Sequence, residues 1–423
     1  MTMNPEYGRS PRIVPATLSF NLRLSALAVT AGCVLIIGIG MMQPVQAQTF
    51  TVLHTFTGPD GLSPYSGVVM DRAGSLYGTT YGGGATGNGT VYQLKRNGTG
   101  YIHHQLHAFT GGNDGDQPYG GVALGQYGVL YGTSNGGTND SGIVFSLQQP
   151  FSICRSVSCP WFRNVLYDLI SGGNAAPFYG QPALDAAGNI YATSGFGGSN
   201  EYGTVFEVSR SGSGWTGTTL YFFQDPYDRY PAHNVILDSL GNLYGTTSGG
   251  GDYSQGAVFE LEHSGSGWVE HLLVSFGAPG TCTGYTLSGL IMDAAGNLYG
   301  ATTGDGTTAC VFELSPSSGG WQFSVLYTFT ISNGGQGPVG NLVMGSNGTL
   351  YGTTEGLGAN GLGNIFQLSH SGSGWVYTDL YDFSNHGDGE YPTGDLTIDS
   401  NGNIYGTNIG DATGHGVVWK LTP

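Results

Sequence analysis

Apolar and polar positions alternate along this chain in short segments, and one such segment returns seven times. Each copy has an apolar residue, a tyrosine and three small or polar residues, as in LYGTT, and the tyrosines recur every 52 to 60 residues. Alternation predicts a β-strand, and a self-similar period of this length predicts one supersecondary unit stacked many times. The copies are Leu76–Thr80, Leu130–Ser134, Ile190–Ser194, Leu243–Thr247, Leu298–Thr302, Leu350–Thr354 and Ile404–Asn408.

A short strand that ends in an acidic turn precedes the tyrosine segment. In five copies the turn begins at an aspartate and has a glycine three residues later, whereas Gly125 and Gly345 take the aspartate position in the other two. Aspartate caps the N–H groups of a tight turn and glycine adopts positive φ. We therefore expect a structural role for these aspartates, which are Asp71, Asp185, Asp238, Asp293 and Asp399.

Two further strand patterns follow the tyrosine segment in each repeat. The third strand resembles VFEL and carries an aromatic residue at its second position in every copy; the fourth resembles LYxF. A Ser/Gly-rich loop joins the two strands and ends in a tryptophan in four copies. The aromatic residues of the third strand are Tyr92, Phe145, Phe206, Phe259, Phe312, Phe366 and Trp419.

Four antiparallel strands in each of seven units, with no helical pattern, predict an all-β fold, namely a seven-bladed β-propeller. A β-solenoid is the alternative, but its coils are usually shorter. The repeats begin with an orphan fourth strand at Phe50–Phe56 and end at Leu421 with a third strand. We therefore expect the N-terminal strand to pair into the last blade and close the ring, which removes an exposed edge.

We therefore predict that residues 48–423 form one propeller of seven repeats, each about 54 residues long. The loops between blades and the loops between second and third strands then share one end of the ring, here called the interblade rim. The predicted blades are residues 66–109, 119–170, 181–223, 233–276, 287–329, 340–383 and 395–421 with 49–56.

Residues 1–47 differ from the repeats and predict an export signal. Three arginines precede the uncharged apolar run Leu24–Met42, and a small-residue pattern ends at Ala47. We expect cleavage after Ala47 and a secreted, periplasmic or cell-surface protein, with an uncleaved N-terminal membrane segment as the alternative. The formal charge of −17 argues against binding to nucleic acid or to anionic lipid.

Four cysteines follow residue 47, and an even number in an exported chain favours disulfides over metal ligands. Cys154 and Cys159 are close in sequence, and Cys282 and Cys310 fall on the same rim of the predicted propeller. The sequence therefore predicts two disulfides.

The motif D-x-x-G-N-L-Y-G-T-T, followed by G-T-V-F-E-L and then W…LYxF, resembles the GloVer tandem repeat family, named for gloeobacterial and verrucomicrobial proteins. The resemblance covers all seven repeats, and segments such as Leu184–Tyr191 are also similar to NHL-type propeller repeats. Both resemblances imply a propeller and transfer no activity.

Most chemistry-like motifs coincide with repeat positions. His103 and His107 share a face but lie about 13 Å apart along a strand, too far for one metal ion. His54 and His107 occupy a position where other repeats have tyrosine, and Gly132–Gly136 matches G-x-S-x-G only because it overlaps the tyrosine segment. No metal-ligand set is assigned.

Acidic residues of the interblade rim could hold Ca²⁺, and the alternative is that they are solvated acids of turns. These residues are Asp60, Asp114, Asp116, Asp225, Asp228, Asp388, Glu390, Glu201, Asp252, Asp305, Glu355 and Asp411.

Two segments depart from the repeat. Residues 224–233 combine aromatic, acidic and basic side chains and are expected beside two neighbouring loops, a composition that suits sugar binding or acid–base chemistry on a glycan. This candidate binding site comprises Asp225, Tyr227, Asp228, Arg229, Tyr230, His233, Glu201, Tyr202, Asp252 and Tyr253. Residues 148–164 form either a partner contact or a packed insertion, with Phe151, Cys154, Arg155, Cys159, Trp161 and Arg163.

These observations favour an exported, monomeric binding module without catalysis, whose partner is a polysaccharide or a cell-surface protein. One alternative is a polysaccharide lyase or hydrolase with Asp225, Asp228, Glu201 and Asp252 as its acids. Another is a structural envelope protein. An enzyme requires two carboxyl groups that converge on one cleft, whereas a binder requires an aromatic-lined depression.

Overall fold

A computed structural model of the 423-residue chain shows Gln48–Pro423 as one compact unit. The structure describes residues 48–149, 161–170, 174–177, 180–198, 200–224, 228–231, 233, 235–265, 267–304, 309–330, 337–356, 358–372 and 374–423, without the side chains of 174–177, 228 and 229.

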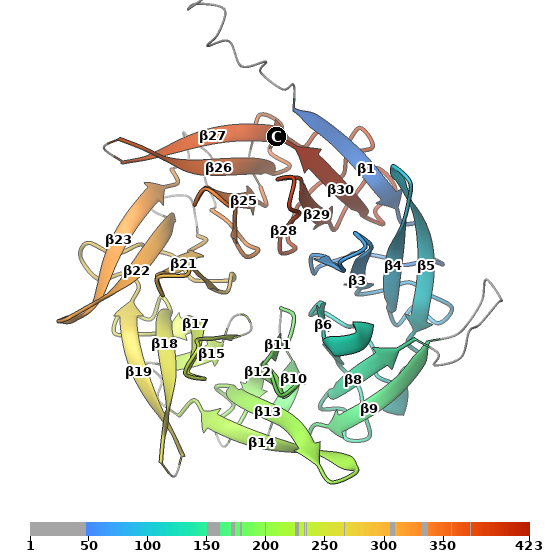
Figure 1. The fold of residues 1–423 in the computed structure, drawn as a ribbon, viewed down its shortest axis with the longest axis horizontal. Coiled ribbons are helices and arrows are strands. Elements are labelled where there is room, and N and C mark those ends of the chain that lie inside the picture. Colours follow the sequence, from blue (N-terminus) through green and yellow to red (C-terminus); the bar gives the residue numbers. More distant parts are fainter. Residues whose placement is uncertain are drawn as a thin grey trace, which may run out of the picture. The chain divides into compact units, whose positions relative to one another are not determined.

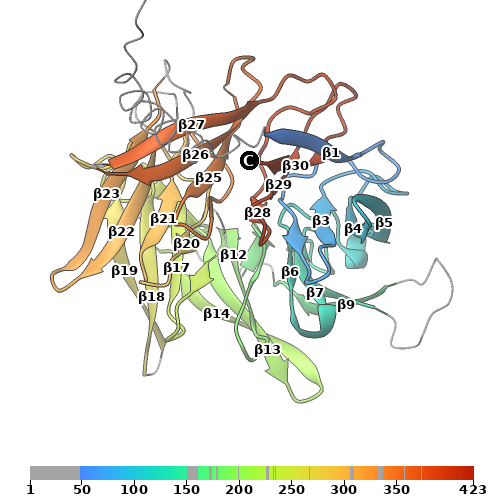
Figure 2. The same ribbon diagram turned by 45° about the horizontal axis from the view of Figure 1, so that its top comes forward.

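Seven antiparallel sheets are arranged in a ring, each with its shortest strand innermost (Figure 1). The predicted seven-bladed propeller is confirmed. Figure 2 shows the same ring tilted, with the sheets stacked side by side.

The sheets follow one another in chain order. Blade 1 contains β2 (Val69–Met70), β3 (Leu76–Thr80), β4 (Thr90–Asn97) and β5 (Gly100–Ala108). Blade 2 contains β6 (Val122–Leu124), β7 (Leu130–Ser134), β8 (Ile143–Gln148) and β9 (Phe162–Asp168). Blade 3 contains β10 (Asn174–Pro177), β11 (Ala183–Leu184), β12 (Ile190–Gly197), β13 (Thr204–Ser211) and β14 (Gly214–Phe222). Blade 4 contains β15 (Asp228–Pro231), β16 (Ile236–Leu237), β17 (Leu243–Gly250), β18 (Ala257–Ser264) and β19 (Gly267–Ser275).

The remaining blades have four strands each. Blade 5 contains β20 (Ile291–Met292), β21 (Leu298–Ala301), β22 (Cys310–Ser317) and β23 (Gly320–Thr328). Blade 6 contains β24 (Val343–Met344), β25 (Leu350–Thr354), β26 (Asn364–Ser371) and β27 (Gly374–Asp382). Blade 7 contains β28 (Thr397–Ile398), β29 (Ile404–Asn408), β30 (Val417–Thr422) and β1 (Thr49–Thr55). Two short 3₁₀ helices, Gly112–Asp114 and Gln126–Gly128, were not predicted.

Blades 3 and 4 each contain a fifth strand. β10 and β15 pair with extended second strands, β12 and β17, beside the regular inner strands β11 and β16. Part of the segment 224–233, expected to be a loop, is therefore a strand.

Ring closure follows the prediction. β1 pairs antiparallel with β30, from Thr49 opposite Thr422 to Thr55 opposite Val417. Phe50 of β1 stacks on Tyr381 of blade 6, with ring centroids 4.1 Å apart. The N-terminal strand thus completes blade 7 and also contributes to the interface with blade 6.

The hydrophobic core lies between adjacent blades. In one cluster Tyr77 of blade 1 packs with Leu130 and Phe145 of blade 2, and equivalent clusters recur around the ring. All seven third-strand aromatic residues are fully buried. The glycine of LYGTT is required here, because a Cβ on Gly132 would lie 2.5 Å from the ring of Phe145.

Hydrogen bonds explain why the other positions of the repeat carry polar residues. The Asp71 carboxylate accepts hydrogen bonds from the N–H groups of Ala73 and Ser75 and from the Tyr77 hydroxyl. The Thr79 hydroxyl donates to the Gly120 carbonyl of the next blade. The D-x-x-G aspartates therefore have the predicted structural role, and the first threonine of LYGTT links neighbouring blades.

The disulfide between Cys282 and Cys310 is present, with the two Cα atoms 5.7 Å apart. It joins the loop between blades 4 and 5 to the start of β22, so both cysteines lie on the interblade rim as predicted. Cys154 and Cys159 lie outside the described residues. Within the part of the chain that the structure describes, no helix has the length and apolar character needed to cross a membrane.

Candidate functional site

The described residues of the segment 224–233 are divided between the interblade rim and the interior of the ring. Tyr230 of β15 donates its backbone N–H to the Tyr202 carbonyl at 2.7 Å, and the two rings lie 6.1 Å apart. The expected proximity of these two tyrosines is therefore present. Asp225 and Tyr227 lie outside the described residues, as do the side chains of Asp228 and Arg229.

Three other expected members of the rim site are exposed. Glu201 lies in the loop after β12, and Asp252 and Tyr253 lie in the loop after β17. The Asp252 N–H donates to the Ser275 hydroxyl, and Tyr253 packs near Gly277, so these two residues contact the end of β19 and the loop after it. Both contacts lie where blade 4 leads into blade 5, whereas the contact of Tyr202 with Tyr230 joins blades 3 and 4.

His233 occupies a different place from Tyr230. It is only 4% exposed, and its Nε2 lies 3.3 Å from the Asp395 carboxylate of blade 7. The Asp395 carboxylate also accepts the Asn341 N–H of blade 6, and the Asn341 side chain accepts the Gly289 N–H of blade 5. A polar network therefore joins the inner ends of blades 4, 5, 6 and 7.

This network forms one wall of a cavity of about 140 Å³. All seven blades contribute lining residues, which places the cavity on the ring axis. The residues come from the segments that lead into the first strands and from the loop after a second strand, so the cavity lies at the end of the ring that carries the interblade rim. The lining residues are Tyr65, Ser66, Tyr119, Gly180, His233, Leu287, Val339, Glu355, Thr393 and Asp395. We call this space the axial cavity.

Aromatic side chains line another part of the axial cavity. Tyr65 of blade 1 and Tyr119 of blade 2 have ring centroids 4.6 Å apart, and Tyr81 packs against both at 5.5 and 4.8 Å. Tyr65 and Tyr119 remain half-buried, so part of each ring is accessible from the cavity.

The two carboxyl groups of the axial cavity have different electrostatic environments. Burial raises the pKa of Glu355. Burial would also raise the pKa of Asp395, but the neighbouring His233 and the Asn341 N–H together outweigh it and hold this pKa below the usual value. Glu355 is therefore the more readily protonated of the two, and Asp395 stays ionised beside its histidine partner.

The sequence marked His233 and Glu355 as candidate residues, but no spacing placed them together. A signal was present in the repeat alignment, because His233 occupies a position that is glycine or serine in the six other blades. These residues are Ser66, Gly120, Gly180, Ser288, Gly340 and Gly394. A single imidazole among small residues at the inner end of a blade can reach across the axis.

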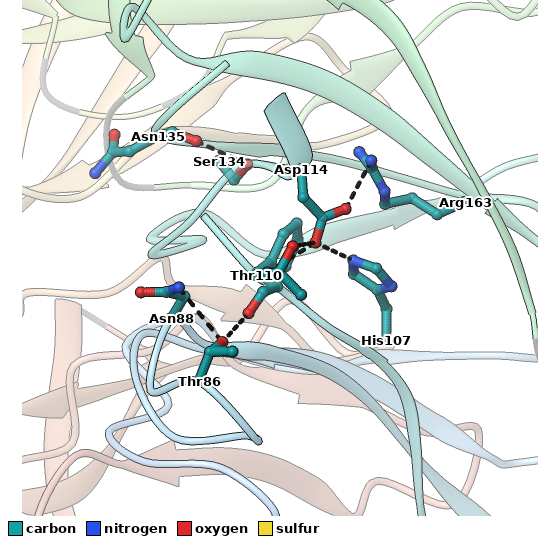
Figure 3. A network of polar contacts seen from close by, with 9 residues as sticks. Thr86, Asn88, His107, Thr110, Asp114, Ser134, Asn135 and Arg163 are labelled. Atoms are coloured by element: carbon teal, nitrogen blue, oxygen red, sulfur yellow. Dashed lines mark hydrogen bonds and ion pairs between the residues drawn. The ribbon is translucent and has the colours of Figure 1, made fainter. Parts of the chain in front are cut away.

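The acidic residues of the interblade rim are in part structural. Asp114 accepts hydrogen bonds from the Thr110 N–H and hydroxyl, and it also contacts His107 and Arg163 (Figure 3). Asp60 is bound in the same way by Thr57 and contacts His54. Asp388 repeats the arrangement with Ser384 and Tyr381, and Asp411 caps its own turn. His54, His107 and Tyr381 thus occupy equivalent positions in the fourth strands of their blades.

The insertion at 148–164 is described only at its two ends. Trp161 packs against Tyr77 of blade 1 with centroids 6.1 Å apart, as Trp215 packs against Tyr131. Arg163 lies in β9 and pairs with Asp114. These two residues are therefore packed between blades, while Phe151, Cys154, Arg155 and Cys159 lie outside the described residues.

One histidine contact was missed. His103 of β5 stacks on His54 of β1, with ring centroids 4.3 Å apart, rather than acting with His107. Burial, followed by the neighbouring His54, lowers the pKa of His103 to about 4. The two histidines belong to the blades that meet where the ring closes, so no spacing within one repeat could reveal the contact.

The fold and site define a closed seven-bladed propeller with an axial cavity. The chain belongs to the Gloeobacter/Verrucomicrobia repeat family, whose model matches residues 38–158, 163–334 and 283–423. Among curated proteins no match is found.

Solved structures match this chain at low sequence identity. A putative oxidoreductase (glucose dehydrogenase) from Thermus thermophilus is 12% identical with a TM-score of 0.42, covering 89% of this chain and 100% of that one. A triple mutant of AofleA from Arthrobotrys oligospora is 11% identical with a TM-score of 0.44, covering 79% and 90%. A putative 6-phosphogluconolactonase from Bacteroides uniformis is 16% identical with a TM-score of 0.48, covering 78% and 88%.

Proposed function

We propose that this protein is an exported binding module that takes the end of a glycan into the axial cavity. The observation that carries the proposal is the combination of tyrosine rings and buried polar groups in one cavity. Sugar rings present an apolar face and a set of hydroxyl groups, so a site for them needs an aromatic surface together with a few placed hydrogen-bonding groups.

The polar groups of the cavity suit a neutral ligand that carries hydroxyl groups. Glu355 and Asp395 offer carboxyl oxygens as acceptors, and Thr393 offers a hydroxyl. The Nδ1 atom of His233 is buried and has no hydrogen-bond partner among the described residues. Two acids and a chain charge of −17 disfavour an anionic ligand.

The size of the cavity and the disulfide also support the proposal. A volume of about 140 Å³ holds several water molecules, which is the scale of one sugar ring rather than of a long oligosaccharide. The Cys282–Cys310 disulfide supports export, because disulfides persist in oxidising compartments.

A glycan array tests this function with three forms of the full chain. We expect the wild type to be retained on a subset of glycans, Tyr119→Ala to lose retention, and Tyr253→Ala to keep it. Tyr253 is the matched control, since it is 49% exposed on the same rim and does not line the cavity. Loss of retention with Tyr253→Ala but not with Tyr119→Ala would place binding on the rim loops and contradict the proposal.

A second candidate function is acid–base cleavage of the bound glycan. It is favoured by the opposite pKa shifts of Glu355 and Asp395 within one cavity, a pattern that assigns acid and base roles in glycan-active enzymes. The same array, read for released product, separates the two functions. Release by the wild type but not by Glu355→Gln, with retention unchanged, would establish the enzyme. Retention without release supports the binding module. If the wild type shows no retention and no release, the result supports a structural envelope protein.

A further inference from the structure

Three side chains of types that can ligate metal ions meet where the propeller closes. They are His54 of the closing strand β1, Asp60 of the turn after it, and His103 of β5 in blade 1. One ligand atom from each residue lies within 4.8 Å of the other two, and all three residues are half-buried. β1 and β5 are adjacent at the outside of the ring (Figure 1), so the cluster is separate from the axial cavity.

We propose that His54, Asp60 and His103 form a binding site for a divalent transition-metal ion that fastens the closing strand to blade 1. Two imidazoles and one carboxylate are a set that Zn²⁺ takes, with water completing a four-coordinate shell. The half-buried position leaves room for that water ligand.

The carboxylate is already oriented for this role. The Asp60 Oδ1 accepts hydrogen bonds from the Thr57 N–H and the Thr57 hydroxyl, both at 2.8 Å. The other oxygen, Oδ2, lies 3.0 Å from Nε2 of His54. Hydrogen bonds to one oxygen of a ligating carboxylate fix its direction and are typical of metal sites.

His103 supplies the second observation. Its Nε2 is buried and has no hydrogen-bond partner among the described residues. Phe56 packs edge-on against the rings of both His54 and His103 and limits their movement. The imidazoles are nearly parallel, at 9°, so a bound ion requires one ring to turn until both lone pairs converge. Buried polar atoms usually have a hydrogen-bond partner, and a bound ion would supply the missing partner of this nitrogen.

The equivalent histidine–aspartate pair between blades 1 and 2 has a structural role without a metal ion. His107 and Asp114 repeat the His54–Asp60 pair, but Arg163 contacts the carboxylate there, with Nη2 at 2.6 Å from Asp114. The cation of the arginine already neutralises that carboxylate. At the closure, a second histidine stands near the pair, and a metal ion would supply the missing positive charge.

The test is a chelator competition for Zn²⁺ with the full chain, combined with a thermal unfolding scan. We expect one Zn²⁺ site in the wild type, weakened by about a hundredfold or more in His103→Phe and by about tenfold in Thr57→Val. Phenylalanine keeps the ring packing of His103, and near-ultraviolet circular dichroism checks that the variant is folded. Zn²⁺ should raise the melting temperature of the wild type but not of His103→Phe.

His271→Gln is the matched control, because His271 and Glu262 form an exposed pair that could hold Zn²⁺ at the surface. Zn²⁺ affinity should be unchanged in this variant. The proposal is overturned if the wild type binds no Zn²⁺, if His103→Phe binds it as tightly as the wild type, or if His271→Gln abolishes binding. Asp60→Asn provides an independent variant if His103→Phe does not fold, and it should also lose the tight site.

Discussion

The imidazole of His233 in blade 4 lies 3.3 Å from the carboxylate of Asp395 in blade 7, so one side-chain contact joins opposite parts of the ring. The side chains are 5% and 14% exposed, and both line the axial cavity. The same pair therefore shapes the candidate ligand site and links blades that are not neighbours in sequence.

The first prediction concerns this pair. His233→Ser gives blade 4 the residue that blades 1 and 5 carry, and it should reduce the free energy of unfolding by about 2 kcal/mol, because Asp395 keeps a buried charge without its partner. Asp395→Gly should be similarly costly. In urea unfolding the double variant should be more stable than the sum of the single losses predicts, by about 1 kcal/mol or more. Strict additivity would show that the two residues do not interact.

The second prediction concerns the tyrosine of the repeat. The Tyr77 hydroxyl donates to Asp71 and accepts the side-chain N–H of Gln93, and all three groups are held in a largely buried site. Tyr77→Phe should reduce the unfolding free energy by about 1–2 kcal/mol, since both partners lose a hydrogen bond.

Tyr351→Phe is the matched control for this prediction, because Gly345 takes the aspartate position in blade 6. It should cost clearly less than Tyr77→Phe in the same denaturation experiment. An equal cost in the two blades would mean that the Tyr–Asp contact does not account for the stability that the hydroxyl contributes.

The third prediction concerns ring closure. Phe50 stacks on Tyr381 and also contacts Phe383 and Trp419. Phe50→Ala should reduce the unfolding free energy by about 3 kcal/mol, as expected for loss of a packed aromatic side chain. Val269→Ala, at a position that is 44% exposed, should change it by less than about 0.5 kcal/mol. If both variants unfold like the wild type in a thermal scan, the closing strand contributes little to stability.

The fourth prediction concerns acid. The Asp411 carboxylate is buried, which raises its pKa, but the N–H groups of His415 and Thr413 and the Thr413 hydroxyl outweigh this, and the pKa lies below the ordinary value of 3.8. The unfolded chain then takes up the proton first, so the stability that Asp411 contributes is present above about pH 4 and is lost as the pH falls further.

Asp411→Asn should therefore be less stable than the wild type at pH 7, and the difference should shrink between about pH 4 and pH 2. Unfolding free energies measured across this range check the prediction. A difference that stays constant with pH would show that the carboxylate charge of Asp411 does not contribute.

The sequence predicted the blades because each repeat position has a local physical reason. Asp71 caps its own turn, Gly132 makes room for a ring in the adjacent strand, and the tyrosine segments alternate as strands do. The register was harder to predict. In every blade the fourth strand carries one extra residue, such as Leu106 between His107 and Gln105, where the pairing with the third strand shifts. A bulge of this kind adds twist to the strand, and the extra residue is a leucine in all seven blades.

The candidate site was harder to predict than the fold, because its residues come from different repeats. His233 and Asp395 are separated by three blades, and Tyr65 and Tyr119 by one, so no local spacing relates them. Likewise, His54 and His103 meet only because the chain ends join. The departures from the repeat pointed to His233, but only closure of the ring shows that it faces the axis rather than the rim.

The central claim is that the axial cavity is the ligand site, and a crystal structure of the protein with a retained oligosaccharide tests it most directly. We expect a sugar ring in the axial cavity, packed on Tyr65 and Tyr119 and hydrogen-bonded to Glu355 or Asp395. Sugar density on the interblade rim beside Tyr202 and Tyr230, with the axial cavity holding only water, would contradict it.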